Sequence, residues 1–341
     1  MIERALLLQI FLLLGALTAV GAESPHDGSL ADSNLHFIGR WDKHDPKLFH
    51  GHWSGHYVRT GFTGATVKAQ IAADANLQVS IDGGTFQEIA GKAGIVNLTP
   101  QPLAAGNHTL LLTTRREEDE IQLQKLEIDP GAATLPSPEL PVIEFIGDSI
   151  TTNAGDRKDY KDFTVTKPYS WRVAELLGAD HVQVSESGVP LTTGHGYFAG
   201  KIGMETQYFK ARNFHHKETD LWEGGYVPAI VVVNLGTNDN GVKDADCAVT
   251  YEKFLRNVRV RNPNAAIVVM RTFNGSLANG TRQAVDTVVK SGDKQIQFVD
   301  TAGWLEASDY MDGIHPIAAG SLKAAKRLAE VLAPLLPKKT E

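Results

Sequence analysis

Three residues within the segment 142–337 have side chains suited to nucleophilic chemistry. Ser149 follows an apolar run directly, so its hydroxyl is expected at the start of a helical turn, where backbone N–H groups stabilise developing negative charge. Asp312 and His315 lie three residues apart in a later, non-helical segment, so a carboxylate and an imidazole can meet there. A serine hydroxyl is a poor nucleophile unless a base removes its proton, and an imidazole can do so at neutral pH.

Two further segments supply hydrogen-bond donors. Gly188 follows the second apolar run, and a glycine lets the backbone N–H approach a substrate closely. Asn238 follows the third run, and its side-chain amide is a strong neutral donor. Each segment alone is also typical of an ordinary turn, and Ser149 alone is typical of a helix N-cap. Their order, with each segment placed after a predicted strand, favours one shared site.

The elements that must position these residues alternate along residues 142–337. Short runs rich in valine and isoleucine predict strands, and the segments between them have helical period. Strands of this kind are buried on both faces, so we expect a three-layer α/β/α domain with a parallel sheet. In such sheets the reactive groups gather at the carboxyl ends of the strands. The predicted strands are 142–146, 182–184, 229–235, 265–270 and 296–299, and the predicted helices are 169–177, 245–260, 276–290 and 317–336.

The first half of the chain has a different period. Residues 34–129 show short alternating segments, such as 66–72, 77–81 and 108–113, separated by glycine-containing turns. This pattern predicts an antiparallel β-sandwich domain of the jelly-roll type. Residues 130–141 are rich in proline and are interpreted as a linker between the two domains.

The N-terminus indicates the compartment. Residues 1–22 have a short charged start, an apolar run and small residues at a cleavage position, which is the pattern of a secretory signal peptide. We therefore expect a secreted, extracellular protein with no membrane segment after cleavage; a membrane anchor is the alternative reading of the same run. N-glycosylation sequons occur at Asn97, Asn107, Asn274 and Asn279.

The composition excludes several classes of protein. The 341 residues include 33 Lys and Arg against 40 Asp and Glu, so the net charge of −7 argues against a nucleic-acid binder. Apolar residues make up 42% of the chain, which is too many for a disordered protein. The single cysteine, Cys247, excludes an intrachain disulfide framework and is interpreted as a small buried hydrophobic residue.

The four segments together resemble the SGNH, or GDSL-type, hydrolase superfamily over roughly residues 141–337. That superfamily takes serine, glycine, asparagine and histidine from four such blocks. The matching blocks are Gly147-Asp148-Ser149-Ile150, Gly188, Gly236-Thr237-Asn238-Asp239 and Asp312-x-x-His315-Pro316. The resemblance implies a nucleophile at Ser149, a general base at His315 and an imidazole-orienting group at Asp312. It also implies an oxyanion hole formed by the N–H groups of Ser149 and Gly188 and the side chain of Asn238.

A β-sandwich ahead of an SGNH domain is similar to carbohydrate esterase family two, whose members remove acetyl groups from xylan and related polysaccharides. The segments 37–41, 52–55, 185–188 and 204–208 look similar to that family's pattern. One departure follows Ser149: the family more often has an aromatic residue in a short glycine turn, whereas this chain has the charged stretch 156–162. This departure concerns the lip of the acyl pocket and therefore acyl selectivity.

The resemblance implies a serine esterase, such as an acetylxylan esterase, that acts on an acetylated polysaccharide or oligosaccharide. We expect no cofactor, no nucleic-acid partner and a monomer. Two alternatives stay open at this point: a general GDSL-type carboxylesterase or lipase, and a carbohydrate-binding protein with an inactive hydrolase site.

Several other residues are weighed for binding roles. Trp304 could form an aromatic wall for a sugar ring or could belong to the core, and Asp148 and Tyr310 are weaker substrate-binding candidates. His50, His52 and His56 suggest a metal site, but the sequence nearby lacks the carboxylate that such a site needs, so no metal is expected. The charged run 115–120 and the pair His215 and His216 are both expected to be solvated.

Overall fold

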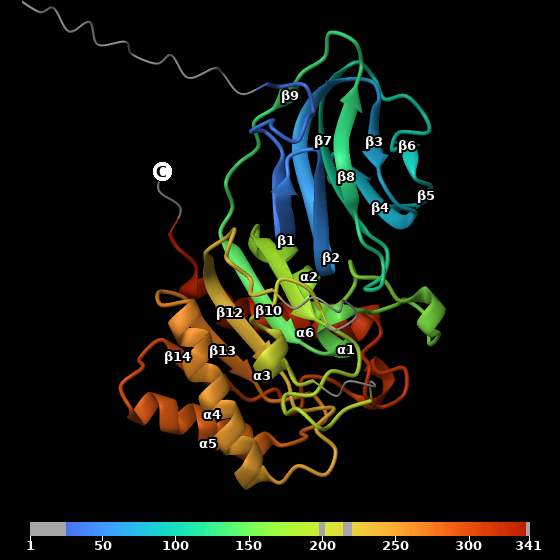
Figure 1. Ribbon diagram of the computed structural model, residues 1–341. Helices are drawn as coiled ribbons and strands as arrows, with labels where there is room; N and C mark the ends of the chain where they lie inside the picture. The colour runs from blue at the N-terminus through green and yellow to red at the C-terminus, as the bar shows by residue number, and fades with distance from the viewer. Residues whose placement is uncertain (1–24, 198–201, 214–219, 339–341) are drawn as a thin grey trace, which may run out of the picture.

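The computed structural model describes residues 25–197, 202–213 and 220–338. An antiparallel β domain is followed by an α/β domain with a parallel sheet, so the predicted fold class is confirmed (Figure 1). The predicted signal peptide and the pair His215 and His216 lie outside the described residues.

The first domain is a nine-stranded antiparallel sheet that curls around its own core (Figure 1). Its hydrogen-bonded order is β5-β4-β7-β2-β8-β3-β6, and β1 and β9 also pair with β2. Buried and half-buried residues alternate along β3, as expected of strands with one face on a core. The strands are β1 (His36–Asp45), β2 (Leu48–Gly64), β3 (Val67–Ile71), β4 (Ala75–Ile81), β5 (Gln87–Gly91), β6 (Gly94–Asn97), β7 (Gly106–Thr114), β8 (Gln122–Ile128) and β9 (Thr134–Leu135).

The long strand β2 joins the two sides of this domain. Its first part pairs with β8 at Phe49 and His50, and its second part, from Tyr57 onward, pairs with β7. Between these parts the backbone of Trp53 and Gly55 has a positive φ, +67° and +63° respectively, so the strand bulges. Because β2 belongs to both sides, the predicted sandwich is hydrogen-bonded into one continuous sheet.

Part of the predicted linker is a strand. Thr134–Leu135 forms β9, which pairs with Gly61 and Phe62 of β2. These two residues lie between Pro130 and Pro136, and unlike the prolines they have backbone N–H groups free to pair. The proline-rich segment is therefore anchored to the first domain over part of its length.

The second domain contains a five-stranded parallel sheet of order β11-β10-β12-β13-β14. Strand β10 therefore has β11 on one side and β12 on the other. Its strands are β10 (Val142–Gly147), β11 (Asp180–Ser185), β12 (Pro228–Asn234), β13 (Ala266–Met270) and β14 (Ile296–Val299). Its helices are α1 (Ser149–Thr152), α2 (Tyr169–Leu177), α3 (Met204–Gln207), α4 (Asp244–Arg261), α5 (Ala278–Lys290) and α6 (Ala318–Leu332), with short 3-10 turns η1 (Tyr160–Asp162), η2 (Ala307–Asp309) and η3 (Ala333–Leu335).

Helices cover both faces of this sheet. Val231 and Val233 of β12 pack in a core cluster with residues of α4 and α5, whereas Ile230 and Val232 pack with residues of α2 and α6. Neighbouring residues of one strand thus enter cores on opposite faces, which explains why the strands are continuous apolar runs. Cys247 of α4 is a buried member of the first of these clusters, as expected.

The two domains are joined by buried polar contacts. Arg59 of β2 donates to the Asp180 carboxylate from Nε at 2.9 Å and from Nη2 at 2.8 Å. The Tyr57 hydroxyl donates to the same carboxylate at 2.6 Å. Trp53, in the bulge of β2, is buried in the core of the second domain. The first domain is therefore packed against the α/β domain through residues of β2.

Two of the segments that resemble the esterase family meet at the same junction. Arg40 of segment 37–41 is 1% exposed, and its guanidinium lies 5.1 Å from the ring centroid of Tyr208 in segment 204–208. It also lies 5.6 Å from the ring centroids of Trp53 and Trp222 and donates to the Tyr208 carbonyl oxygen. These segments thus hold the domains together.

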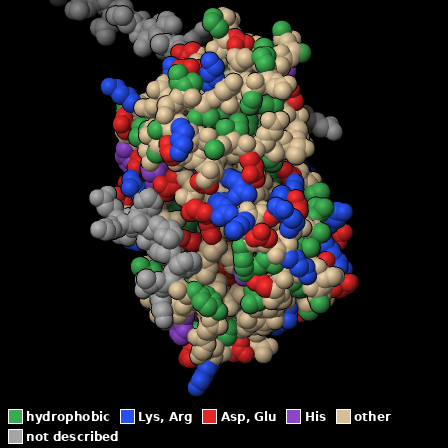
Figure 2. All heavy atoms as spheres, turned by 90° about the vertical axis from the view of Figure 1, so that its right-hand side faces the viewer, with side chains coloured by type: hydrophobic (Ala, Val, Ile, Leu, Met, Phe, Trp, Pro, Cys, Tyr) green, Lys and Arg blue, Asp and Glu red, His purple; other side chains and the backbone are tan. Residues whose placement is uncertain are grey.

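The surface carries charges of both signs. On the face shown in Figure 2, basic and acidic side chains are interspersed around the middle of the molecule. The four sequon asparagines, Asn97, Asn107, Asn274 and Asn279, are all exposed. Among the described residues, no helix has both the length and the apolarity needed to cross a bilayer.

Candidate active site

Ser149 lies at the sharp turn between β10 and α1. A Cβ atom on Gly147 would come within 2.0 Å of Thr151 Oγ1, so only glycine fits where the chain turns. The Asp148 carboxylate accepts a hydrogen bond from Ile150 N at 3.0 Å and caps the short helix. The local sequence thus places the Ser149 hydroxyl at the carboxyl end of β10.

The structure brings His315 and Asp312 to this serine. His315 Nε2 lies 2.9 Å from Ser149 Oγ, and His315 Nδ1 lies 2.7 Å from Asp312 Oδ2. Asp312 Oδ1 accepts from the backbone N–H groups of Ile314 and His315 at 2.9 and 2.8 Å, which folds the loop into a tight turn. Gly313, with φ of +86°, makes this turn possible.

Tyr160 is a member of this group that the sequence did not indicate. Its hydroxyl donates to Asp312 Oδ2 at 2.6 Å and lies 3.1 Å from His315 Nδ1. Tyr160 belongs to the charged stretch 156–162, where the chain departs from the esterase pattern. Nothing in that stretch signals a contact with a loop 152 residues away, so only the fold reveals it.

The Asp312 carboxyl is stabilised in its ionised form. Partial burial raises its pKa, but hydrogen bonds from the His315 backbone, the Tyr160 hydroxyl and the His315 ring outweigh this effect. The net result is a pKa well below the usual range of an aspartate. Asp312 therefore stays ionised beside the imidazole at neutral pH.

Gly188 and Asn238 come from the strands on either side of β10. Gly188 follows β11 and has φ of +75°, and Asn238 follows β12 and is 6% exposed. Asn238 Nδ2 donates to the carbonyl oxygen of Val189 at 3.1 Å, so it links the two segments. Because β10 lies between β11 and β12, these donors flank the Ser149 segment.

A small pocket of about 150 Å³ opens beside Ser149 and His315. The same pocket is lined from the first domain by Arg116, Glu117 and Glu118. The run 115–120 is therefore not simply a solvated hairpin, as its charge suggested. It reaches across the domain junction because it connects β7 to β8 at the end of the first domain that faces the parallel sheet (Figure 1).

Two carboxyl groups are buried where this loop meets the second domain. Glu117 accepts a hydrogen bond from Ser187 N at 2.8 Å, and burial raises the pKa of Glu117. Glu186, after β11, is 3% exposed, and its burial and the neighbouring Glu117 carboxyl raise the pKa of Glu186 to about 9. Glu186 is therefore protonated at neutral pH in the folded protein.

The three substrate-binding candidates from the sequence, Asp148, Trp304 and Tyr310, do not line the pocket. Asp148 is buried beneath the Ser149 turn, and burial raises its pKa to about 7. Trp304 is 8% exposed and belongs to the apolar cluster beneath α2 and α6, which favours the core role over a sugar-binding wall. Tyr310 packs against the same cluster.

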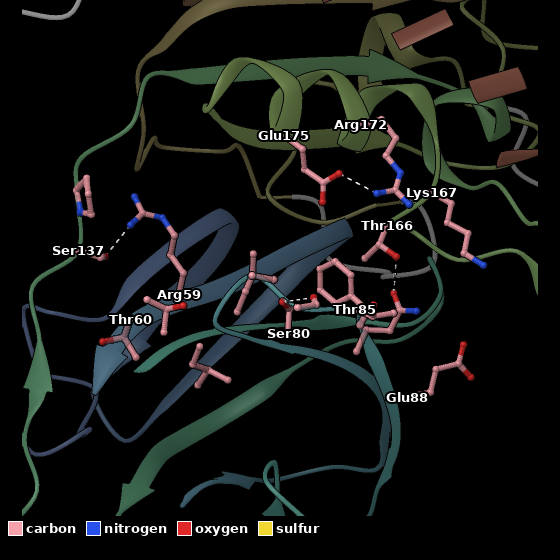
Figure 3. Close-up of a pocket in the computed structure, with 18 of the residues that line it drawn as sticks. Arg59, Thr60, Ser80, Thr85, Glu88, Ser137, Thr166, Lys167, Arg172 and Glu175 are labelled. Atoms are coloured by element: carbon pink, nitrogen blue, oxygen red, sulfur yellow. Dashed lines mark hydrogen bonds and ion pairs between the residues drawn. The ribbon is translucent and has the colours of Figure 1, made fainter. Parts of the chain in front are cut away.

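A larger groove, of about 850 Å³, lies between the domains away from Ser149 (Figure 3). Its charged side chains are paired: Arg172 lies 2.8 Å from Glu175, and Lys167 lies 2.6 Å from Asp156. It holds none of the catalytic candidates, so we place the candidate active site at the smaller pocket.

Models of two known families match the chain. Residues 145–322 match the GDSL-like Lipase/Acylhydrolase family, and residues 37–138 match the carbohydrate esterase 2 N-terminal domain. The two matches follow the division into β domain and α/β domain.

Individual relatives have the same two-part organisation. The cellulase/esterase CelE of Acetivibrio thermocellus is 31% identical over 319 residues, which cover 86% of this chain but only 39% of CelE. A family two carbohydrate esterase from Clostridium thermocellum, solved with cellohexaose, has a TM-score of 0.75 and 26% identity over 88% of this chain and 98% of its own. A family 2 enzyme from Corynascus thermopiles with a carbohydrate-binding domain has a TM-score of 0.73 and 25% identity over 88% of this chain and 99% of its own.

Proposed function

Because the chain belongs to the GDSL-like lipase/acylhydrolase family, we propose that it is a polysaccharide esterase that removes O-acetyl groups through an acyl-enzyme. The observation that carries this proposal is the chain of contacts from Ser149 Oγ through the His315 ring to Asp312, at 2.9 and 2.7 Å. A serine held in this way by an imidazole and a carboxylate is the arrangement used for acyl transfer on several unrelated folds.

In the proposed reaction, the neutral His315 ring has its proton on Nδ1, where Asp312 accepts it. His315 Nε2 removes the proton from Ser149 Oγ while Oγ attacks the ester carbonyl carbon. The same proton is then given to the sugar oxygen as its bond to the acyl carbon breaks, so the sugar leaves with a free hydroxyl and the acetyl group remains on Ser149. Water, deprotonated in turn by His315, hydrolyses this ester and releases acetate.

We assign the oxyanion hole to the Ser149 and Gly188 backbone N–H groups and the Asn238 side chain. The Asn238 amide has two hydrogens, and the bond to the Val189 carbonyl oxygen uses one of them. The other is available to a negatively charged oxygen. Loss of one such donor costs about 2.7–4 kcal/mol of transition-state stabilisation.

The pocket and the relatives support a small acyl group on a carbohydrate. A pocket of about 150 Å³ suits the two carbons of an acetyl group better than a long acyl chain. The relatives include carbohydrate esterases, one of them solved with a bound cello-oligosaccharide. We therefore propose acetylated plant-wall polysaccharide, of the xylan or glucomannan type, as the substrate.

Acetate release from acetylated xylan, glucomannan and pectin tests the substrate, with 4-nitrophenyl acetate and octanoate as reporters of acyl length. We expect acetate from at least one polysaccharide and a strong preference for the acetyl reporter. Preferential turnover of octanoate would instead indicate a general lipase. Polysaccharide binding without any ester hydrolysis would indicate an inactive binding protein.

We also propose that the protein is secreted. The pattern of residues 1–22 and the exposure of all four sequon asparagines support an extracellular location. N-terminal sequencing of the protein from culture supernatant, compared with the cell pellet, tests this. A chain that remains cell-associated with residue 1 intact would contradict it.

A further inference from the structure

Three side chains able to bind a metal meet in the first domain. His50 Nε2 lies 2.8 Å from one oxygen of Glu120, and His52 Nδ1 lies 3.2 Å from the other. The ligand atoms of all three side chains lie within 4.8 Å of one another. His52 is 1% exposed at its side chain, whereas His50 and Glu120 are 18% and 24% exposed. The cluster is therefore partly buried but reachable from solvent.

The strand pairing explains why these residues meet. His50 and His52 are two residues apart on β2, so their side chains point to the same face of the sheet. His50 pairs with Gln122 of β8, and Glu120 lies two residues before Gln122. A carboxylate 70 residues away in the sequence therefore supplies the group that is missing near the histidines.

The nearby His56 has a different role. Its Nδ1 lies 2.8 Å from the Trp53 carbonyl oxygen, and its Nε2 accepts from Ile121 N at 3.1 Å. Both ring nitrogens are thus used by the backbone. His56 holds the end of the β7–β8 loop in place and is not part of the cluster.

We propose that His50, His52 and Glu120 bind one divalent transition-metal ion of the zinc type. Two imidazoles and one carboxylate are a donor set that zinc prefers, whereas calcium and magnesium prefer oxygen ligands. Donor atoms in a tetrahedral zinc site lie ~3.3–3.5 Å apart, given zinc–ligand distances of ~2.0–2.2 Å. The separations of His50 Nε2 and His52 Nδ1 from the Glu120 oxygens, 2.8 and 3.2 Å, are close to this spacing.

The position of Glu120 gives the ion a structural role. Glu120 ends the charged run 115–120, in which Arg116, Glu117 and Glu118 line the pocket beside Ser149. An ion held by Glu120 fixes this loop to β2, and it makes no contact with the ester. The inference does not depend on the proposed reaction, because it rests on the first domain alone.

Zinc titration of the full-length secreted protein, stripped with a chelator and followed by calorimetry, tests the site. We expect one tight equivalent of ZnCl₂, a raised melting temperature, and no comparable binding of CaCl₂ or MgCl₂. His50→Gln and His52→Gln are each expected to weaken zinc binding at least tenfold. His108→Gln is the matched control, since His108 bonds Asp82 at 2.7 Å elsewhere in the same domain, and it is expected to bind zinc normally.

His52 is buried, so weaker zinc binding by His52→Gln does not by itself separate loss of a ligand from loss of folding. The more exposed His50 supplies the second variant. CoCl₂ supplies a direct measurement, because cobalt bound by two imidazoles and a carboxylate has visible absorption that His50→Gln abolishes. Equal zinc affinity in the His50, His52 and control variants would overturn the proposal. So would the absence of stoichiometric zinc or cobalt binding, which would leave the cluster as a hydrogen-bond network only.

Discussion

At the scale of single residues, two side chains hold the His315 ring in place at its Nδ1 atom. Asp312 lies 2.7 Å from this nitrogen, and the Tyr160 hydroxyl contacts both groups. A hydroxyl that donates to a carboxylate stabilises the ionised form, so Tyr160 is one cause of the low pKa of Asp312. In the proposed reaction, Tyr160 is thus a positioning residue that acts through Asp312 and His315.

Tyr160→Phe removes this hydrogen bond and keeps the ring. We expect kcat to fall about threefold to tenfold, or ~0.7–1.4 kcal/mol, because the imidazole is held less firmly. We also expect the pKa of the Asp312 carboxyl, followed by NMR, to rise, because the carboxylate loses one hydrogen-bond donor. Tyr310→Phe, on the same loop as Asp312, is the control. An unchanged kcat together with an unchanged pKa of Asp312 in Tyr160→Phe would contradict the assigned role.

At the scale of elements, the site is built from the loops that follow parallel strands, closed by one loop of the β domain. The contact of Glu117 with Ser187 N joins the β7–β8 loop to the segment after β11. Burial at this junction raises the pKa of both the Glu117 and the Glu186 carboxyls, and the Glu117 carboxyl raises that of Glu186 further. The elements that form the pocket thus also make stability depend on pH.

Stability is expected to fall as pH rises from ~5 to ~9. Glu186 retains its proton in the folded state up to a pKa of about 9, whereas the unfolded chain releases it near the ordinary glutamate pKa of 4.5. The folded state therefore binds more protons in this range, and each pH unit costs up to ~1.4 kcal/mol. Urea unfolding at several pH values should show that Glu186→Gln reduces this slope and that Glu330→Gln, on the exposed side of α6, does not. A slope unaffected by Glu186→Gln would refute the buried, protonated carboxyl.

The sequence predicts those parts of this arrangement that follow from local pattern. Ser149, Gly188 and Asn238 each follow a predicted strand. Because the carboxyl ends of parallel strands meet at one edge of the sheet, the prediction of a parallel sheet alone places these residues close together. Tyr160 and Glu117 could not be predicted, because their contacts depend on how a charged loop and a second domain are packed. Glu120 is the same case: the carboxylate beside His50 comes from the loop before β8, 70 residues away in the sequence.

At the scale of the whole molecule, the first domain is fixed to the second through β2. Asp180 is 4% exposed at its side chain and receives Arg59 and the Tyr57 hydroxyl, so a buried charge pair lies at the junction. Removing one member of such a pair leaves the other charge buried without compensation. Because the β7–β8 loop lines the pocket, separation of the domains would also dismantle the site.

Asp180→Ala is therefore expected to destabilise the protein by ~3–5 kcal/mol and to lower activity in proportion to the unfolded fraction. Chemical unfolding followed by circular dichroism and by activity measures both. Asp74→Ala, which removes the exposed partner of Lys92, is expected to change stability little. Equal stability of the two variants would show that the junction does not hold the domains together.

Ser149 is the proposed nucleophile of an esterase, and the rate of acetate release by Ser149→Ala measures this role. The wild type and Ser149→Ala are compared on the best acetylated polysaccharide, with Ser308→Ala on η2 as a control and melting temperatures to verify folding. We predict that Ser149→Ala loses activity by at least ~10⁴-fold while its melting temperature stays that of the wild type. Acetate release by folded Ser149→Ala at a rate close to the wild type would contradict the account.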